Sequence, residues 1–208
     1  MQDGINASAD ERFKALANRR EIMLGTNQYP NFNESMSAKV DKEKAHGCGC
    51  GHSATETPLK SLNKNSLANE FNELRLATES SSKRPKAFML TIGNLSMRLA
   101  RSQFSSNFFA TAGYEIIDNL GFNTVEEGVK AAREKGADVV VLCSSDDEYT
   151  TFAPEAYNLL KGGNELMVVA GAPACMDELK AQGIEHFIHV RSNVLETLKS
   201  FNDKLLNK

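Results

Sequence analysis

Two histidines and two cysteines fall within the short stretch HGCGCGH. They are His46, Cys48, Cys50 and His52, and their nitrogen and sulfur atoms are the ligands that Zn²⁺ prefers in tetrahedral sites. Zinc sites, however, usually place at least two residues between the members of each ligand pair. Here a single glycine separates the cysteines, so we favour adventitious metal binding or plain flexibility. A zinc-dependent regulator is the alternative that these four residues leave open.

A second group of candidate residues follows three apolar runs in the region from residue 86 onward. Gly93 and Asn94 follow the first run, Ser144 and Ser145 the third, and Gly171 the fourth. If these runs are strands of a parallel sheet, the residues meet at its carboxyl edge, where such sheets bind ligands. The two serines and the aspartates after them could bind a small ligand. Because these residue types are favoured at helix caps, we prefer a solvated loop that caps the next helix.

The spacing of apolar residues from position 86 onward predicts an alternation of strands and helices. The first helix should present Met97, Ala100, Phe104 and Phe108 to the core. Thr124 with Glu127 forms a capping box for the second. Strand and helix alternation indicates a five-stranded parallel sheet of the flavodoxin-like order 2-1-3-4-5. The five strands are expected at residues 87–92, 114–118, 138–143, 165–170 and 186–190.

The N-terminal part has a different composition. Residues 9–24 suggest one helix that ends near Gly25, and a polar stretch rich in Ser, Asn, Lys and Glu follows. A short helix at residues 66–77 is expected inside this stretch, since Leu67, Phe71 and Leu74 share one helical face. The chain therefore divides into residues 1–34, a linker at 35–85 and an α/β domain at 86–208.

Composition excludes several classes of function. The formal net charge of the 208 residues is −3 and the basic residues form no stripe, which argues against nucleic-acid binding. No apolar run approaches the roughly 20 residues of a membrane span. The first residues lack the features of a signal peptide. With only four cysteines, reduced thiols are favoured over a disulfide framework, and we expect a cytoplasmic protein.

Two separated blocks resemble methylmalonyl-CoA mutase, an adenosylcobalamin-dependent enzyme. RREIMLGTNQYPNF, at residues 19–32, is similar to the segment that closes the substrate-binding TIM barrel of that family. GADVVVLCSSDDEY and GIEHFIHVRSNVLETL resemble parts of its C-terminal domain. The resemblance implies that residues 1–34 are a barrel remnant, that 35–85 are the linker, and that 86–208 form a cobalamin-binding-like domain.

One departure from the family bears on function. Cobalamin-binding chains of the family carry Asp-x-His-x-x-Gly after the first strand, and its histidine coordinates cobalt. This chain has Gly93-Asn94-Leu95-Ser96-Met97-Arg98 there, and Leu95, Met97 and Arg98 would crowd the channel for the nucleotide tail.

In lacking the Asp-x-His-x-x-Gly motif, the chain resembles the small subunit of the heterodimeric members of this family. This resemblance implies a supporting role beside a large catalytic subunit that binds adenosylcobalamin, with no catalytic residue and no cofactor in this chain. The alternative is an autonomous module that binds a corrinoid or another small molecule through Ser144, Ser145 and Gly171.

Overall fold

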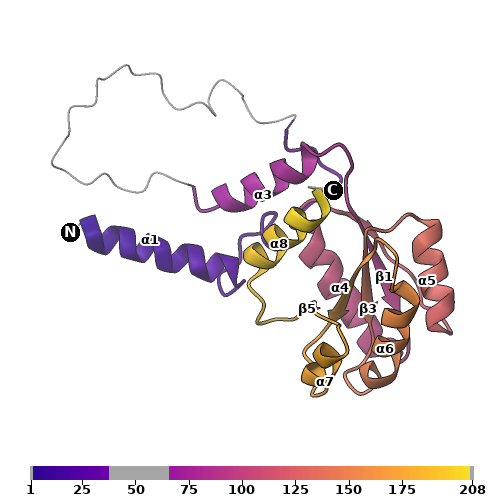
Figure 1. Ribbon diagram of the computed structural model, residues 1–208. Helices are drawn as coiled ribbons and strands as arrows, with labels where there is room; N and C mark the ends of the chain where they lie inside the picture. Colours follow the sequence, from indigo (N-terminus) through magenta and orange to yellow (C-terminus); the bar gives the residue numbers. More distant parts are fainter. Residues whose placement is uncertain (1, 38–65, 207–208) are drawn as a thin grey trace.

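A computed structural model describes residues 2–37 and 66–206. The first of these ranges contains an N-terminal helix. The second begins with another helix, which is followed by a regular alternation of strands and helices (Figure 1). In chain order the elements are α1 (Gln2–Ala17), α3 (Asn69–Glu79), β1 (Lys86–Thr91), α4 (Leu95–Ala110), β2 (Glu115–Ile117), α5 (Val125–Glu134), β3 (Val139–Cys143), α6 (Tyr149–Leu160), β4 (Leu166–Ala170), α7 (Met176–Ala181), β5 (Phe187–Ile188) and α8 (Val194–Leu206).

The five strands form one parallel sheet in the order β2-β1-β3-β4-β5. In the register of the sheet, Met89 of β1 pairs with Val141 of β3, which in turn pairs with Val168 of β4. This is the predicted flavodoxin-like order, and all five expected strands are present. The order places β1 beside β3, so the turns that follow these two strands lie at the switch point of the sheet.

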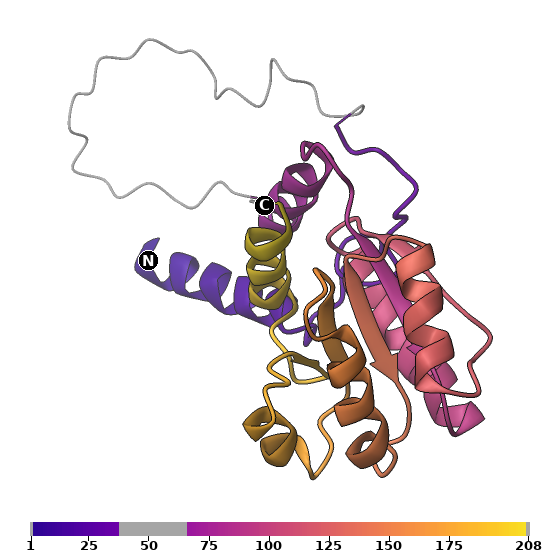
Figure 2. The same ribbon diagram turned by 45° about the vertical axis from the view of Figure 1, so that its right-hand side comes forward.

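Helices cover both faces of the sheet. Successive strand residues point to opposite faces, so Met89 packs toward α4 and α8, while Phe88 and Leu90 pack toward α5, α6 and α7. Figure 2 shows the sheet between these two layers of helices. Fully buried aliphatic residues fill the central strands β1 and β3, as expected for a parallel sheet that is covered on both sides.

The helix starts follow the predicted capping, but the buried face of α4 differs from the prediction. Thr124 accepts a hydrogen bond from the Glu127 N–H at the start of α5, as a capping box requires. In α4, Phe108 is buried and Phe104 partly buried, whereas Ala100 is exposed. Ser102 and Ser105 take inward positions instead. The buried residues of α4 are Ser102, Ser105, Phe108, Phe109 and Ala110.

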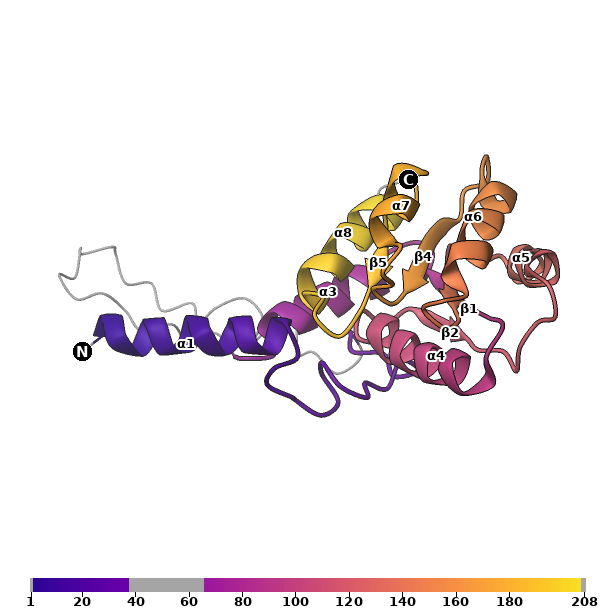
Figure 3. The ribbon, with the colours of Figure 1, turned by 90° about the horizontal axis from the view of Figure 1, so that it is seen from below.

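Helix α1 begins earlier and ends earlier than the sequence predicts. It extends away from the α/β body along most of its length (Figure 3). Among residues 3–17, only Leu16 and Ala17 are buried, and they join the core beneath α8. Arg19 then adopts a left-handed backbone conformation with φ of 54°, which ends the helix before the expected stop at Gly25.

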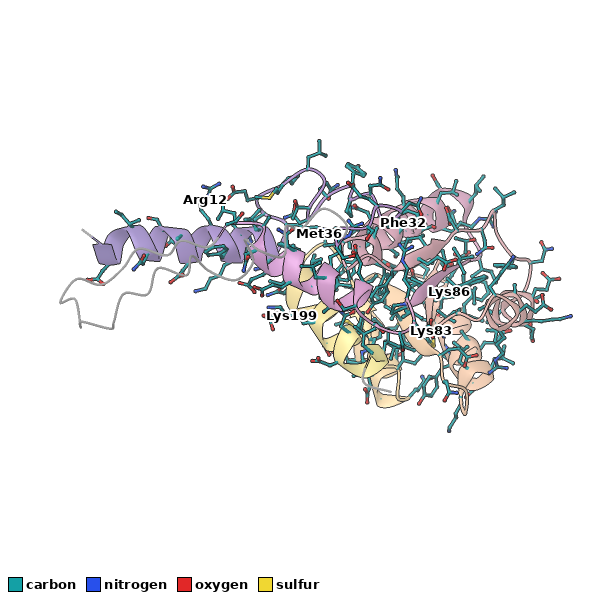
Figure 4. All side chains as sticks on the ribbon, turned by 90° about the horizontal axis from the view of Figure 1, so that it is seen from above. Arg12, Phe32, Met36, Lys83, Lys86 and Lys199 are labelled. Atoms are coloured by element: carbon teal, nitrogen blue, oxygen red, sulfur yellow. The ribbon has the colours of Figure 1, made fainter. Side chains whose placement is uncertain are left out.

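The segment after α1 packs against α3 and α4. The side chain of Asn27 is fully buried and donates hydrogen bonds to the backbone oxygens of Leu16 and Glu21. Arg75 of α3 donates to the Asn31 carbonyl, and Arg84 donates to the Phe32 carbonyl. Phe32 and Met36 accordingly lie beside the α/β body in Figure 4. The origin of residues 1–34 as a barrel remnant stays a prediction.

Helix α3 confirms the short helix expected within the linker. Phe71 and Leu74 are buried against the same core as α8. An ion pair of 2.7 Å joins Glu70 of α3 to Lys199 of α8, which Figure 4 labels. Part of the stretch predicted as a linker is therefore packed onto the domain.

Within the described ranges, the helices lack the combination of length and apolar character that crossing a bilayer requires.

Candidate functional site

The turns after β1 and β3 lie next to each other at the carboxyl edge of the sheet. Their proximity follows from the register, in which Thr91 at the end of β1 pairs with Cys143 at the end of β3. Gly93 has φ of 75°, a conformation that favours glycine, and it lets the chain leave β1 and enter α4. Asn94 is the N-cap of α4, where its side chain accepts a hydrogen bond from the Met97 N–H.

The carboxylate of Glu148 lies between these two turns and draws donors from both. The backbone N–H of Asn94 lies 3.1 Å from each of its oxygens. The hydroxyls of Ser144 and Ser145 donate to Oε2 at 2.6 and 2.7 Å. The backbone N–H of Ser145 adds a fourth donor to Oε2 at 3.2 Å. Four donors from two separate turns therefore converge on one carboxylate.

The electrostatic effect of these donors is large. The Ser144 hydroxyl makes the main contribution, and together with the Ser145 hydroxyl and the two N–H groups it lowers the pKa of Glu148 to about 2 against the opposing effect of burial. Hydrogen bonds to the ionised form of a carboxyl stabilise that form. Glu148 therefore carries its negative charge throughout the physiological range.

The glycine of the first turn is needed for this arrangement. A Cβ atom at Gly93 would lie only 2.3 to 2.6 Å from the carboxyl atoms of Glu148. Close approach of the backbone to a charged group is a common reason for glycine at such turns. Here the group that approaches the backbone is a side chain of the same protein.

Arg98 of α4 bridges the turn after β1 and the loop after β2. Its guanidinium donates to the carbonyl oxygens of Gly93 and Leu120, both at 3.2 Å. A Cβ at Gly121 would lie 2.6 Å from the guanidinium carbon, so this loop is also packed closely on Arg98. Leu95 and Arg98 are two of the residues expected to crowd a ligand channel. Arg98 does span loops at this edge of the sheet, whereas Leu95 is 59% exposed to solvent.

A third connection runs from α4 to the turns after β3 and β4. Arg101 forms an ion pair of 2.9 Å with Asp146. A Cβ at Gly171 would lie 3.1 Å from the Asp146 carboxylate and 3.4 Å from the Arg101 guanidinium carbon, so Gly171 packs directly on this pair. Three connections made by side chains of the protein thus join neighbouring loops at the carboxyl edge of the sheet, and that of Glu148 joins the two turns of the switch point.

Tyr149 fixes the ends of β3 and β4 beside this edge of the sheet. Its hydroxyl donates to the Ala170 carbonyl at 2.6 Å and accepts a hydrogen bond from the Ser144 N–H at 3.1 Å. The ring is fully buried, and burial raises the pKa of the phenol well above its usual range. Tyr149 therefore ties β3 to β4 beneath the two serines, in a structural role.

The structure places the predicted candidates at one edge of the sheet but gives them a partner that sequence reasoning missed. Asn94, Ser144 and Ser145 meet on Glu148, and Gly171 lies against Asp146. The serines were expected to cap α6, yet their hydroxyls bind Glu148, and the N-cap position of α6 makes no side-chain capping bond. A carboxylate three and four residues after two serines is the signal that could have indicated this contact.

The predicted metal candidates His46, Cys48, Cys50 and His52 lie outside the described residues. Across residues 2–37 and 66–206, no group of three or more His, Cys, Asp or Glu side chains is arranged to hold a metal ion. The His186 ring packs edge-on against Phe201, with a centroid distance of 5.4 Å. His189 accepts a hydrogen bond from the Arg191 N–H at 3.2 Å. Both contacts are with neighbouring residues of the chain itself.

Comparison with known proteins yields relatives of one kind. The chain is 58% identical over 205 residues to the methylmalonyl-CoA mutase small subunit of Porphyromonas gingivalis, covering 98% of this chain and 32% of that protein. It is 28% identical to the small subunit of Streptomyces virginiae, covering 98% and 31% of the two chains. It is 27% identical to that of Propionibacterium freudenreichii subsp. shermanii, covering 97% and 30%.

These matches confirm the resemblance found in the sequence. The chain spans about a third of the length of the curated relatives it matches. No protein-family model matches it.

Proposed function

Because the chain resembles methylmalonyl-CoA mutase small subunits along nearly its whole length, we propose that it serves as the C-terminal part of such a subunit. In this role it supports the isomerisation of succinyl-CoA and methylmalonyl-CoA by a partner large subunit. The partner supplies the catalytic residues and binds adenosylcobalamin, whose homolytic chemistry drives the reaction. The proposal includes a cytoplasmic location, to which the free thiols of Cys143 and Cys175 are suited.

The observation that carries the proposal is that the chain's own side chain, Glu148, joins the two turns at the switch point of the sheet. Flavodoxin-like domains bind their ligands at this place. Here Glu148 occupies the space between the two central turns, and Arg98 spans the first turn and the next loop. A domain that keeps its core while its own side chains close the ligand edge is suited to packing against a partner rather than to binding a cofactor.

The residues of the first turn do not fit cobalamin. A cobalt ligand from this turn would have to be a side chain such as histidine, but the turn consists of Gly93 and the helix cap Asn94, whose side chain already accepts the Met97 N–H. The Glu148 carboxylate touches the backbone of the same turn. We therefore assign no step of the reaction to this chain.

A spectral titration with adenosylcobalamin tests the proposal. The purified chain and the candidate large subunit, which should carry Asp-x-His-x-x-Gly and be encoded nearby, are titrated separately under the same conditions. We expect saturable spectral changes with the large subunit and none with this chain. A saturable change with this chain alone would instead establish the alternative, an autonomous corrinoid-binding module.

Association with the large subunit is the second test. The small subunit that contains this chain should elute with the large subunit as one species in size-exclusion chromatography, with a defined stoichiometry measured by light scattering. Elution of the two as separate species at micromolar concentration would contradict the partner role.

A further inference from the structure

The two turns at the switch point of the sheet present a set of four donors to an anion. Two hydroxyl groups, from Ser144 and Ser145, and two backbone N–H groups, from Asn94 and Ser145, converge at distances of 2.6 to 3.2 Å. The set combines two chain segments, the turn after β1 and the turn after β3. Arg98 and Arg101 of α4 flank it, Arg98 by its bond to the Gly93 carbonyl and Arg101 by its pair with Asp146.

Such a set resembles the way proteins bind small oxyanions. Backbone N–H groups at helix starts and hydroxyls of nearby residues commonly hold carboxylates and phosphates. The close approach of Gly93 to the bound carboxyl group is a second feature of these sites, because a side chain at this position would exclude the anion. In this protein the anion is covalently attached, since it is the side chain of Glu148.

We infer that the turns after β1 and β3 form a carboxylate-binding site and that Glu148 is its built-in ligand. The side chain holds the two turns together and excludes an external anion from their donors. Removal of the Glu148 carboxylate should therefore expose a site for a small carboxylate ion. This inference rests on the contacts of Glu148 and holds whether or not the chain belongs to a mutase.

Chemical rescue with acetate tests the inference. The variant Glu148→Ala keeps the Cβ and lacks a CH₂–COO⁻ unit, which acetate replaces almost atom for atom. The melting temperature is measured at neutral pH in sodium acetate and in sodium chloride of equal ionic strength. We expect Glu148→Ala to melt about 5 °C below the unaltered chain in chloride, because bonds to a charged acceptor are lost. Acetate should recover at least half of this loss with saturable dependence on its concentration.

Two controls exclude a general salt effect. The unaltered chain should melt at the same temperature in both salts, because Glu148 already fills the site. The variant Asp147→Ala removes an exposed carboxylate from the same turn and should also show no preference for acetate. If Glu148→Ala responds equally to acetate and chloride, Glu148 is an ordinary structural residue and the inference is wrong.

Hydrogen exchange provides a test that does not require Glu148→Ala to fold. The variant Glu148→Gln keeps the shape of the side chain but removes its charge. We expect the amide hydrogens of Asn94 and Ser145 to exchange at least about tenfold faster than in the unaltered chain, since charged acceptors bind N–H groups more strongly than neutral ones. Amides in the middle of β3 should be unchanged. Equal exchange of Asn94 in the two proteins would overturn the inference.

Discussion

The guanidinium of Arg19 lies 3.1 Å from the hydroxyl of Thr111, although Arg19 follows α1 and Thr111 lies at the end of α4. The same group donates to the Asn107 carbonyl and lies over the ring of Phe108, 5.5 Å from its centroid. The segment that follows α1 is thus bound to the α/β domain. Arg19 shares this attachment to α4 with Tyr29, whose backbone N–H donates to the Asn107 side chain at 2.7 Å.

Replacing Arg19 should loosen this segment. In Arg19→Ala the hydrogen bonds to the Asn107 carbonyl and the Thr111 hydroxyl are lost, and we expect the free energy of unfolding to fall by about 1 to 3 kcal/mol. Arg20 is exposed and is also an arginine, so Arg20→Ala is the matched control. It should change the free energy of unfolding by less than about 0.5 kcal/mol. Urea denaturation followed by circular dichroism measures both. Equal losses in the two variants would show that the Arg19 contacts contribute nothing.

A buried polar cluster should be equally sensitive to substitution. Asn202 of α8 is 5% exposed, accepts a hydrogen bond from the Tyr114 hydroxyl at 2.8 Å and donates one to the Thr78 hydroxyl at 3.0 Å. In Asn202→Ala the Tyr114 hydroxyl loses its partner in the core, which should cost about 1 to 3 kcal/mol. The adjacent, exposed Asp203 gives the control Asp203→Ala, which should cost less than about 0.5 kcal/mol.

Thermal unfolding of the two α8 variants compares these effects directly. Because α8 covers α3 and α4 in the core, the Asn202 substitution should lower the midpoint for the whole domain in one transition. An unchanged midpoint in Asn202→Ala would mean that the cluster is dispensable.

The dependence of stability on pH should identify Glu148. Its pKa is lowered from 4.5 to about 2 in the folded chain, mainly by the Ser144 hydroxyl. A depressed pKa contributes stability that is complete above 4.5 and is lost as the pH falls toward 2. We expect a loss of about 1 to 3 kcal/mol in this window, after allowance for solvent screening.

The variant Glu148→Gln separates this effect from other titrating groups. The amide cannot take up a proton in this window, so the unfolding free energy of the variant should fall less steeply between pH 5 and pH 2 than that of the unaltered chain. Asp147→Asn should keep the steep dependence. Parallel curves for the unaltered chain and Glu148→Gln would exclude a depressed Glu148 pKa.

The sheet could be predicted from the sequence because its determinants are local. Five apolar runs separated by helical periodicity are enough to specify parallel strands with covering helices, and capping residues such as Thr124 mark the helix starts. The contact between Glu148 and Asn94 could not be predicted in this way, because it depends on the pairing of β1 with β3 in three dimensions. The end of α1 at Ala17 escaped prediction for a similar reason, since Asn27, ten residues later, binds the Leu16 and Glu21 carbonyls around that turn.

Finally, the two described cysteines should be almost unreactive in the folded chain, and Cys143 most of all. Cys143 ends β3, is fully buried, and burial raises the pKa of its thiol to about 12. Cys175 is partly buried, and burial raises the pKa of its thiol as well. Because the thiolate is the reactive form, iodoacetamide at pH 8 should label Cys143 only after unfolding, and Cys175 slowly before it. Peptide mass spectrometry with and without urea measures the order in which the two cysteines are labelled. Rapid labelling of Cys143 in the folded chain would show that β3 is open to solvent.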